Sequence, residues 1–189
     1  TVDGKTREYP AGITFGEIAR VYQKNYPHQI ALAVRNGKIR ELFKKVDKDC
    51  TIEFLTVSDD TGHKTYNRTA TIILMKAITE VVGANKIDRI KMEFAIGNGY
   101  YCSKSGDFEV TDELVEQVKA KMQEYIDKDL CIIKKSMPLD EANALFETQK
   151  MTDKVSLFRY RGNSTVNVYN LDGYYDYFYG FMLPSTGYV

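Results

Sequence analysis

The chain ends in the segment GYYDYFYGFMLPSTGYV, residues 173–189, from which we predict how the fold is organised. Tyrosines at every second position from 175 to 179 alternate with Asp176 and Phe178, a period of two that is typical of a β-strand. Large aromatic rings contribute heavily to core energetics, so this run predicts burial against another part of the chain. We expect the strand to close a domain that starts near residue 65, and to face residues 67–71.

The composition limits the possible classes of protein. At 189 residues the chain suits one large or two modest domains, and 43% hydrophobic with 28% charged residues predicts a soluble protein with a core. The formal net charge of zero argues against general nucleic-acid binding but leaves a local basic patch open. Three separate cysteines form no CxxC and indicate reduced thiols in a cytoplasmic protein. No apolar run approaches the roughly 20 residues of a membrane span, so no membrane partner is expected.

The sequence of residues 1–60 predicts one small α+β unit. Thr14 and Glu17 form a capping-box pattern, which predicts the start of a helix. Asn36-Gly37 predicts a two-residue turn between two strands. The order of elements predicts a β-grasp (ubiquitin-like) sheet crossed by one helix. The expected strands span residues 5–9, 30–35, 38–42 and 50–56.

Three stretches of this unit resemble the TGS domain. They are Asp3-Gly4-Lys5, residues 9–14 (YPAGIT) and residues 33–37 (AVRNG). TGS domains occur at the front of threonyl-tRNA synthetases, certain GTPases and stringent-response enzymes. The resemblance covers the first third of the chain and implies an accessory module for binding or regulation, with no chemistry of its own.

A second domain is predicted over residues 61–189, because the polar, glycine-containing stretch 58–63 indicates a domain boundary. Its first element is a strongly apolar helix over 69–82, which Gly83 ends. The later elements expected are strand 89–96 with its return at 100–102, helix 111–128, strand 131–135, helix 138–146, and a hairpin of strands 155–161 and 165–170.

This second segment resembles the editing domain of threonyl-tRNA synthetases (the second additional domain), which alanyl-tRNA synthetases share. The matching pieces keep their order along the chain, so the resemblance implies an α+β sandwich. They are the helix at 72–82, Gly99-Tyr100-Tyr101, Thr111-Asp112-Glu113, Asp129-Leu130, Asp140-Glu141-Ala142 with Leu145-Phe146, and Pro184-Ser185-Thr186-Gly187.

The chemistry of that family does not carry over to this chain. Its members place two histidines four residues apart on the first helix, and a cysteine and a histidine four residues apart before Pro-Ser-Thr-Gly. On a helix, such a pair puts two ligands for a zinc ion or a water on one face. Here the matching positions are Asn67, Thr71, Phe178 and Met182, and none is a good zinc ligand or a base. We therefore expect a degenerate editing site with no catalytic residue, metal or cofactor.

A TGS unit followed by a synthetase-like segment without its catalytic set resembles the N-terminal half of bacterial uridine-kinase-like nucleoside kinases. No GxxxxGK[ST] sequence occurs here, so ATP-dependent phosphoryl transfer, with its ATP and Mg, is expected only in a kinase domain beyond residue 189. The main hypothesis is thus a non-catalytic accessory region of such a kinase. The alternative is the N-terminal editing region of a protein related to threonyl-tRNA synthetase, which binds or hydrolyses aminoacyl-tRNA.

Three further hypotheses stay open. Asp176, near the old site, could act as the base of a zinc-independent hydrolase. Tyr179 could join Asn67 and Thr71 in a polar pocket for a small nucleotide-like ligand, although core packing also explains the tyrosine run. Arg159 and Arg161 flank a tyrosine and could contact RNA, or protect an exposed strand edge.

Overall fold

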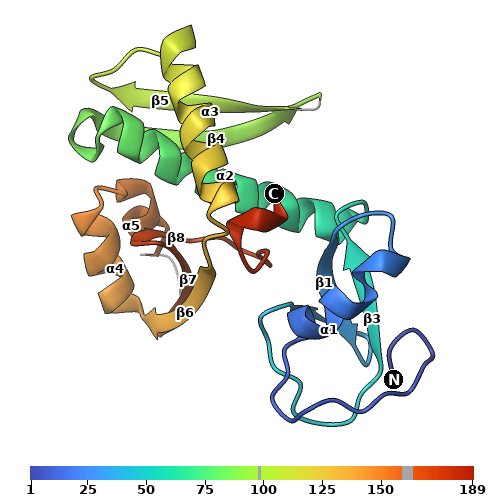
Figure 1. Ribbon diagram of the computed structural model, residues 1–189. Coiled ribbons are helices and arrows are strands. Elements are labelled where there is room, and N and C mark those ends of the chain that lie inside the picture. Colours follow the sequence, from blue (N-terminus) through green and yellow to red (C-terminus); the bar gives the residue numbers. More distant parts are fainter. Residues whose placement is uncertain (98, 159–163) are drawn as a thin grey trace. The chain divides into compact units, whose positions relative to one another are not determined.

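The computed structural model describes residues 1–97, 99–158 and 164–189 (Figure 1). These residues form a mixed α+β fold whose strands make three small sheets. The chain divides into two compact units, and each is described by itself. Unit 1 comprises Thr1–Thr71, Ile126–Ile132 and Phe178–Val189, and unit 2 comprises Ile72–Tyr125 and Ile133–Tyr177. The division into sequence domains 1–60 and 61–189 stays a prediction.

Helix α1, Phe15–Tyr22, begins where its sequence predicts. The Thr14 hydroxyl accepts from the backbone N–H of Glu17 at 3.1 Å, and the Glu17 carboxylate accepts from the N–H of Thr14 at 2.8 Å. A short 3₁₀ turn, η1 (Gln23–Asn25), follows the helix. The reciprocal pair of bonds confirms the predicted capping box.

The sheet of unit 1 has the strand order β2-β1-β3. β1 (Ile30–Arg35) pairs antiparallel with both β2 (Lys38–Glu41) and β3 (Ile52–Thr56). Asn36 and Gly37 have positive φ angles of 47° and 76°. This backbone geometry confirms the predicted two-residue turn between β1 and β2.

The N-terminal segment lies next to β3 instead of forming the predicted strand. Val2 makes a parallel bridge to Ile52. Over residues 5–9 the structure shows a single isolated bridge, from Lys5 to Val2, so the predicted strand is wrong. The two residues between these bridge partners have positive φ angles of 46° and 78°, which turn the chain before a longer strand can form.

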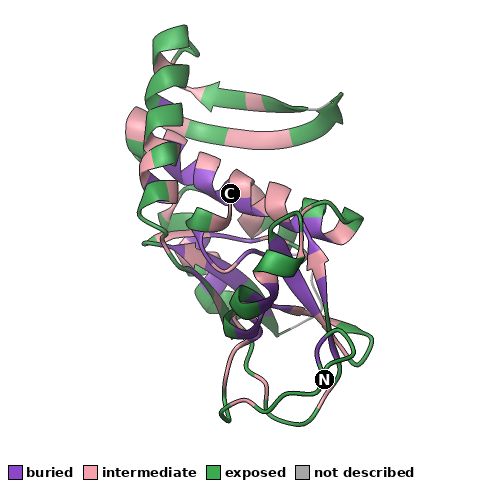
Figure 2. Ribbon diagram, turned by 45° about the vertical axis from the view of Figure 1, so that its right-hand side comes forward, coloured by how far each residue is buried: buried purple, intermediate pink, exposed green. Residues whose placement is uncertain are grey.

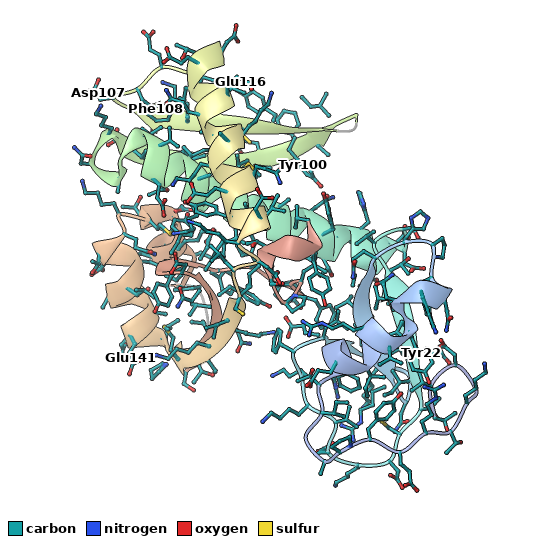
Figure 3. The ribbon with its side chains drawn as sticks, viewed as in Figure 1. Tyr22, Tyr100, Asp107, Phe108, Glu116 and Glu141 are labelled. Atoms are coloured by element: carbon teal, nitrogen blue, oxygen red, sulfur yellow. The ribbon has the colours of Figure 1, made fainter. Side chains whose placement is uncertain are left out.

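The core of unit 1 lies between α1 and the sheet. The helix buries one apolar face, as expected for an amphipathic helix. Tyr22, labelled in Figure 3, comes from this face, and its ring lies 6.2 Å from the Phe54 ring. The buried members of this core are Val2, Phe15, Ile18, Ala19, Tyr22, Ile30, Ala33, Leu42, Ile52 and Phe54.

Helix α2, Asp60–Val82, begins well before the predicted helix 69–82, so the predicted start is wrong. Gly62 is required by packing, since an added Cβ would lie 1.8 Å from the Thr56 carbonyl oxygen. Polar residues fit this part of the helix because their hydroxyls bond back to it; Thr65 donates to the carbonyl four residues earlier at 2.8 Å. Gly83 has a φ angle of 90° and ends the helix, as predicted.

Unit 2 contains a two-stranded antiparallel ribbon of β4 (Ile87–Ile96) and β5 (Gly99–Gly106), as the alternating sequence predicts. Most residues of the ribbon are exposed or half-buried (Figure 2). Helix α3, Asp112–Asp127, follows. The Thr111 hydroxyl accepts from the backbone N–H of Leu114 at 3.2 Å, which confirms the predicted N-cap.

The third sheet has the order β6-β7-β8. Helix α5 replaces the predicted strand 155–161 as far as Phe158, and residues 159–161 lie outside the described residues. A helix here buries Phe158 completely, with its ring 5.6 Å from Phe146 and 5.2 Å from Tyr177. The elements of this region are β6 (Ile132–Pro138), α4 (Leu139–Thr148), α5 (Thr152–Phe158), β7 (Thr165–Leu171) and β8 (Tyr174–Asp176).

The predicted closing strand is only three residues long. The carboxylate of Asp176 accepts from the backbone N–H of Tyr177 at 2.7 Å, which takes up a group that a continuing strand would offer to its neighbour. Tyr177 is buried but Tyr179 is 85% exposed, so the predicted alternation of buried tyrosines fails beyond β8. The final twelve-residue segment, Phe178–Val189, belongs to unit 1 and has one 3₁₀ turn, η3 (Thr186–Tyr188).

Candidate functional site

The four predicted site positions all lie in unit 1. Asn67 and Thr71 are half-buried on α2, about one helical turn apart. Phe178 and Met182 come from the segment after β8; Phe178 is half-buried and Met182 is completely buried. The structure therefore brings the positions selected by the resemblance into one compact unit.

Helix α2 and the C-terminal segment contact each other directly. The backbone N–H of Leu183 donates to Thr69 Oγ1 at 3.0 Å, and that hydroxyl donates to the Thr65 carbonyl at 2.9 Å. The Arg68 guanidinium lies against Gly180, where an added Cβ would come within 2.5 Å of the guanidinium carbon. The prediction that this part of α2 faces the chain end is confirmed by these contacts.

The predicted positions offer hydrogen-bonding and apolar groups, but no strong ligand or base. The Thr71 hydroxyl donates to the Asn67 carbonyl at 2.8 Å, which engages its proton within the helix. Met182 is buried, and a thioether is only a weak acceptor. This donor set does not fit a zinc ion, which prefers thiolate, imidazole and carboxylate ligands.

A buried carboxylate that the sequence analysis missed lies beside this segment. Glu41, at the end of β2, is 3% exposed, and its Oε1 accepts from the backbone N–H of Met182 at 3.3 Å. It thus holds the chain at one of the four predicted positions. The sequence offered one indication of this residue, because Glu41 is acidic and lies within a strand expected to pack on a core. Carboxylates are rarely buried without a partner, so such a position predicts a specific contact.

The Pro184-Ser185-Thr186-Gly187 sequence closes unit 1. The Pro184 carbonyl accepts from the Ile132 N–H at 2.9 Å. The Gly187 N–H donates to Asp129 Oδ1 at 3.1 Å, and an added Cβ on this glycine would approach the same oxygen to 2.5 Å. Close packing therefore explains the glycine in this sequence.

Asp176, the candidate base, is enclosed within unit 2. Its side chain is 6% exposed, and Oδ1 lies 3.0 Å from the Lys154 ammonium. Burial raises the pKa of this carboxyl, while the Lys154 charge and the Tyr177 N–H act in the opposite direction. A general base must reach the proton of a substrate, and this carboxylate is buried and already paired. Its contacts link β8 to α5.

The other predicted contacts have separate outcomes. Tyr179 leaves its ring available to solvent, so core packing does not explain this member of the tyrosine run. Arg159 and Arg161 lie outside the described residues. The RNA contact assigned to these two arginines stays a prediction.

Unit 2 contains a charged cluster that the sequence analysis also missed. Lys76 on α2 has a side chain that is 6% exposed; its ammonium lies 2.5 Å from a Glu80 carboxylate oxygen and 3.1 Å from the Asp172 carbonyl. The ammonium groups of Lys76 and Lys121 lie 5.2 Å and 5.6 Å from the centre of the Tyr125 ring. The signal was a lysine within an apolar helix followed by a glutamate four residues later.

The pKa values in this cluster follow from burial and pairing. Burial acts to raise the pKa of the Glu80 carboxyl, but hydrogen bonds from Lys76 and Tyr125 and the lysine charges hold it below its usual range. Burial and the adjacent Glu80 carboxylate raise the pKa of the Tyr125 hydroxyl. Glu80 is therefore ionised near neutral pH, and the cluster is an ion pair.

Two cavities lie within single units. One of about 880 Å³ in unit 1 is lined largely by residues 6–11 and 46–52. The other, of about 480 Å³ in unit 2, is lined by the second half of α2, the start of β4, the α4–α5 connection and the β7–β8 turn. Neither of these two cavities is lined by the four predicted site positions.

In the described ranges, no three histidine, cysteine or carboxylate side chains lie close enough to hold a metal ion. His28 and His63 are both exposed. Across the same part of the chain, the structure contains no helix with the length and apolarity needed to cross a membrane.

Comparison with known proteins finds relatives over nearly the whole chain. No protein-family model matches the sequence. A threonine–tRNA ligase of Clostridium kluyveri is 31% identical over 186 residues, which cover 98% of this chain and 29% of that protein. The threonine–tRNA ligases of Symbiobacterium thermophilum and Thermotoga maritima are 28% and 30% identical, over 99% of this chain and 28% of each relative.

The chain thus spans 28% to 29% of the length of these relatives. Because the relatives are ligases, they favour the alternative of a ligase-related protein over the main hypothesis of a nucleoside-kinase parent. Across nearly its full length, this chain is homologous to a segment of threonine–tRNA ligases.

Proposed function

We propose that the chain is an accessory region of a larger protein related to threonine–tRNA ligases, and that it binds the aminoacylated end of an RNA without hydrolysing it. The observation that supports this proposal is the chemical nature of the side chains at the four matched positions. Asn67, Thr71, Phe178 and Met182 supply an amide, a hydroxyl, a phenyl ring and a thioether. None of these groups accepts a proton near neutral pH or holds a water-activating metal.

The zinc-independent hydrolase is the less supported alternative. It requires Asp176 to activate water, yet that carboxylate is 6% exposed and bonded to both Lys154 and the Tyr177 N–H. Opening this site would leave the Asp176 charge unpaired inside unit 2 or expose the core around it. A buried charge without its partner is strongly unfavourable.

Binding is supported by an exposed aromatic ring and a half-buried amide in unit 1. Tyr179 is 85% exposed, and nucleobases stack on aromatic faces with little dependence on sequence. Asn67 is half-buried on α2, and a side-chain amide can both donate and accept hydrogen bonds. An adenosine carrying an amino acid presents matching groups, namely a base to stack and polar atoms to bond.

The test uses 3′-(L-threonylamino)-3′-deoxyadenosine, whose amide resists hydrolysis, in calorimetric titrations of the chain. We expect saturable binding that weakens about tenfold in Tyr179→Ala, because stacking on one ring contributes roughly 1–3 kcal/mol. Tyr100→Ala, which removes an exposed tyrosine of β5 in unit 2, is the matched control and should bind like the parent chain. Absence of saturable binding, or an equal loss in both variants, would remove the proposal.

The proposal extends to the predicted TGS-like β-grasp in the first sixty residues. Its support is the parallel bridge between Val2 and Ile52 beside the antiparallel order β2-β1-β3, with α1 packed on the sheet. In a β-grasp the first and last strands run parallel at the centre of the sheet. This part of the chain would then contribute binding rather than chemistry.

The nature of the parent protein remains a proposal. A ligase-related parent has the support of the relatives, whereas a uridine-kinase-like parent rests on the resemblance of a TGS unit followed by a synthetase-like segment without its catalytic set. ATP and Mg would enter only with a kinase domain beyond residue 189, and a cytoplasmic location is proposed for either parent. Sequencing the coding region past Val189 distinguishes the two, since a kinase predicts a P-loop there.

A further inference from the structure

The cavity of about 480 Å³ in unit 2 has the size of a small-ligand site and lies apart from the predicted site positions. Its lining combines apolar side chains with charges of both signs. The apolar members include Met75, Ile87, Ile90 and Met151.

The buried Lys76 ammonium at this cavity is already paired within unit 2. Lys76 is held by the Glu80 carboxylate at 2.5 Å and the Asp172 carbonyl at 3.1 Å. The Lys76 side chain is 6% exposed, so this pair forms a fixed polar wall rather than a free charge. Any charge on a ligand must therefore be met by the other lining residues.

Apart from Lys76, Glu80 and Asp172, four lining residues carry charges at this cavity: Arg89, Lys150, Asp88 and Asp153. Lys150 lies in the α4–α5 connection, where the side chain of Gln149 just before it bonds both the N–H and the carbonyl of Tyr175, at 3.1 Å and 2.9 Å. Lys150 itself has a φ angle of 58°. Two cationic and two acidic groups thus line the cavity in addition to the Lys76–Glu80 pair and Asp172.

We propose that this cavity binds a free α-amino acid with an aliphatic side chain. A zwitterion presents a carboxylate to Arg89 or Lys150 and an ammonium to Asp88 or Asp153, and its side chain covers the apolar wall. A polyphosphate would meet the repulsion of four carboxylates, counting Glu80 and Asp172. A wholly apolar ligand would leave the lining charges desolvated without partners.

Calorimetric titration of the chain with L-leucine tests this site, with glycine, N-acetyl-L-leucine and L-leucinamide as comparisons. We expect saturable binding of L-leucine, weakened at least tenfold when the side chain, the ammonium or the carboxylate is removed. Equal binding of the blocked analogues, no binding of L-leucine, or tighter binding of uridine or AMP at the same site would overturn the proposal.

Variants locate the binding event. Arg89→Gln and Asp153→Asn should each weaken L-leucine binding at least tenfold while thermal unfolding stays cooperative. Arg20→Gln changes another exposed arginine, on α1 in unit 1, and should leave binding unchanged. If Arg20→Gln weakens binding as much as Arg89→Gln, or if neither cavity variant has an effect, the site is not this cavity. The outcome does not depend on whether unit 1 binds an aminoacylated RNA.

Discussion

The two halves of helix α2 bury polar groups of different kinds. In the first half, within unit 1, the hydroxyls of Thr65, Thr69 and Thr71 all donate to carbonyls four residues back. In the second half, within unit 2, Lys76 is buried, and its ammonium pairs with the carboxylate of the more exposed Glu80. The hydroxyls buried in the half that the resemblance marks as the site are thus neutral, whereas the half without a predicted role buries an ammonium.

The comparison shows that the positions matched by the resemblance can hold residues that lack catalytic groups. A hydroxyl that is bonded back into its own helix stabilises packing and offers no general base. A buried ammonium without a partner is strongly unfavourable, so its loss of pairing costs more free energy than the loss of a hydroxyl hydrogen bond. We therefore expect charge substitutions in unit 2 to affect stability more than hydroxyl substitutions in unit 1.

The largest effect is expected for Lys154→Met in unit 2. This change leaves the Asp176 carboxylate buried without its partner at 3.0 Å, and should lower the free energy of unfolding by about 3 kcal/mol at pH 7. Urea unfolding measures this loss. In the double variant Lys154→Met with Asp176→Asn no charge remains, so most of the stability should return. A single-variant loss as small as that of an exposed lysine would contradict the contrast between the units.

A smaller effect is expected for Thr69→Val in unit 1. The variant removes the acceptor of the Leu183 N–H, which leaves a buried donor unsatisfied and should cost about 1.5 kcal/mol. Thr71→Val is the matched control on the same helix, because its hydroxyl donates to the Asn67 carbonyl within the helix. It should cost less than about 0.5 kcal/mol. Equal losses in the two variants would mean that the Leu183 bond does not anchor the chain end.

The pH dependence of stability supplies a third test. The pKa of Asp176 is raised in the folded state, so the folded chain binds the proton of this carboxyl more tightly than the unfolded chain does. Its contribution to stability is complete below the ordinary pKa of 3.8 and is lost as the pH rises through the folded-state pKa. Asp176→Asn removes this loss, so its stability relative to the parent chain should increase from pH 4 towards pH 7. Unfolding curves across this range measure the difference, and a parallel pair of profiles would contradict the assignment.

Local sequence signals predicted the elements whose causes are local. The Thr14–Glu17 capping box, the Asn36-Gly37 turn and the Thr111 N-cap involve residues a few positions apart, and all three are confirmed. The facing of α2 and the chain end was also predictable, since the resemblance pairs those two segments.

The errors arose where distant contacts decide the structure. The polar, glycine-containing stretch 58–63 gave no indication of a helix, but Gly62 lies inside α2, where its lack of a side chain allows close contact with Thr56. Residues up to Phe158 alternate like a strand, yet burial of that ring against Phe146 and Tyr177 favours a helix. The Asp172 carbonyl that accepts from Lys76 and the Lys154 ammonium that pairs with Asp176 lie on other elements, so periodicity alone does not predict these two contacts.

The central claim is that this chain retains the scaffold of an editing hydrolase without groups that activate water. The most direct test is a deacylation time course with tRNA charged with threonine or serine, at a molar excess of the chain over the charged tRNA. The account predicts that ester loss follows the buffer control at every pH from 6 to 8. Faster loss, proportional to the concentration of the chain and removed by a substitution at Asn67 or Asp176, would contradict it.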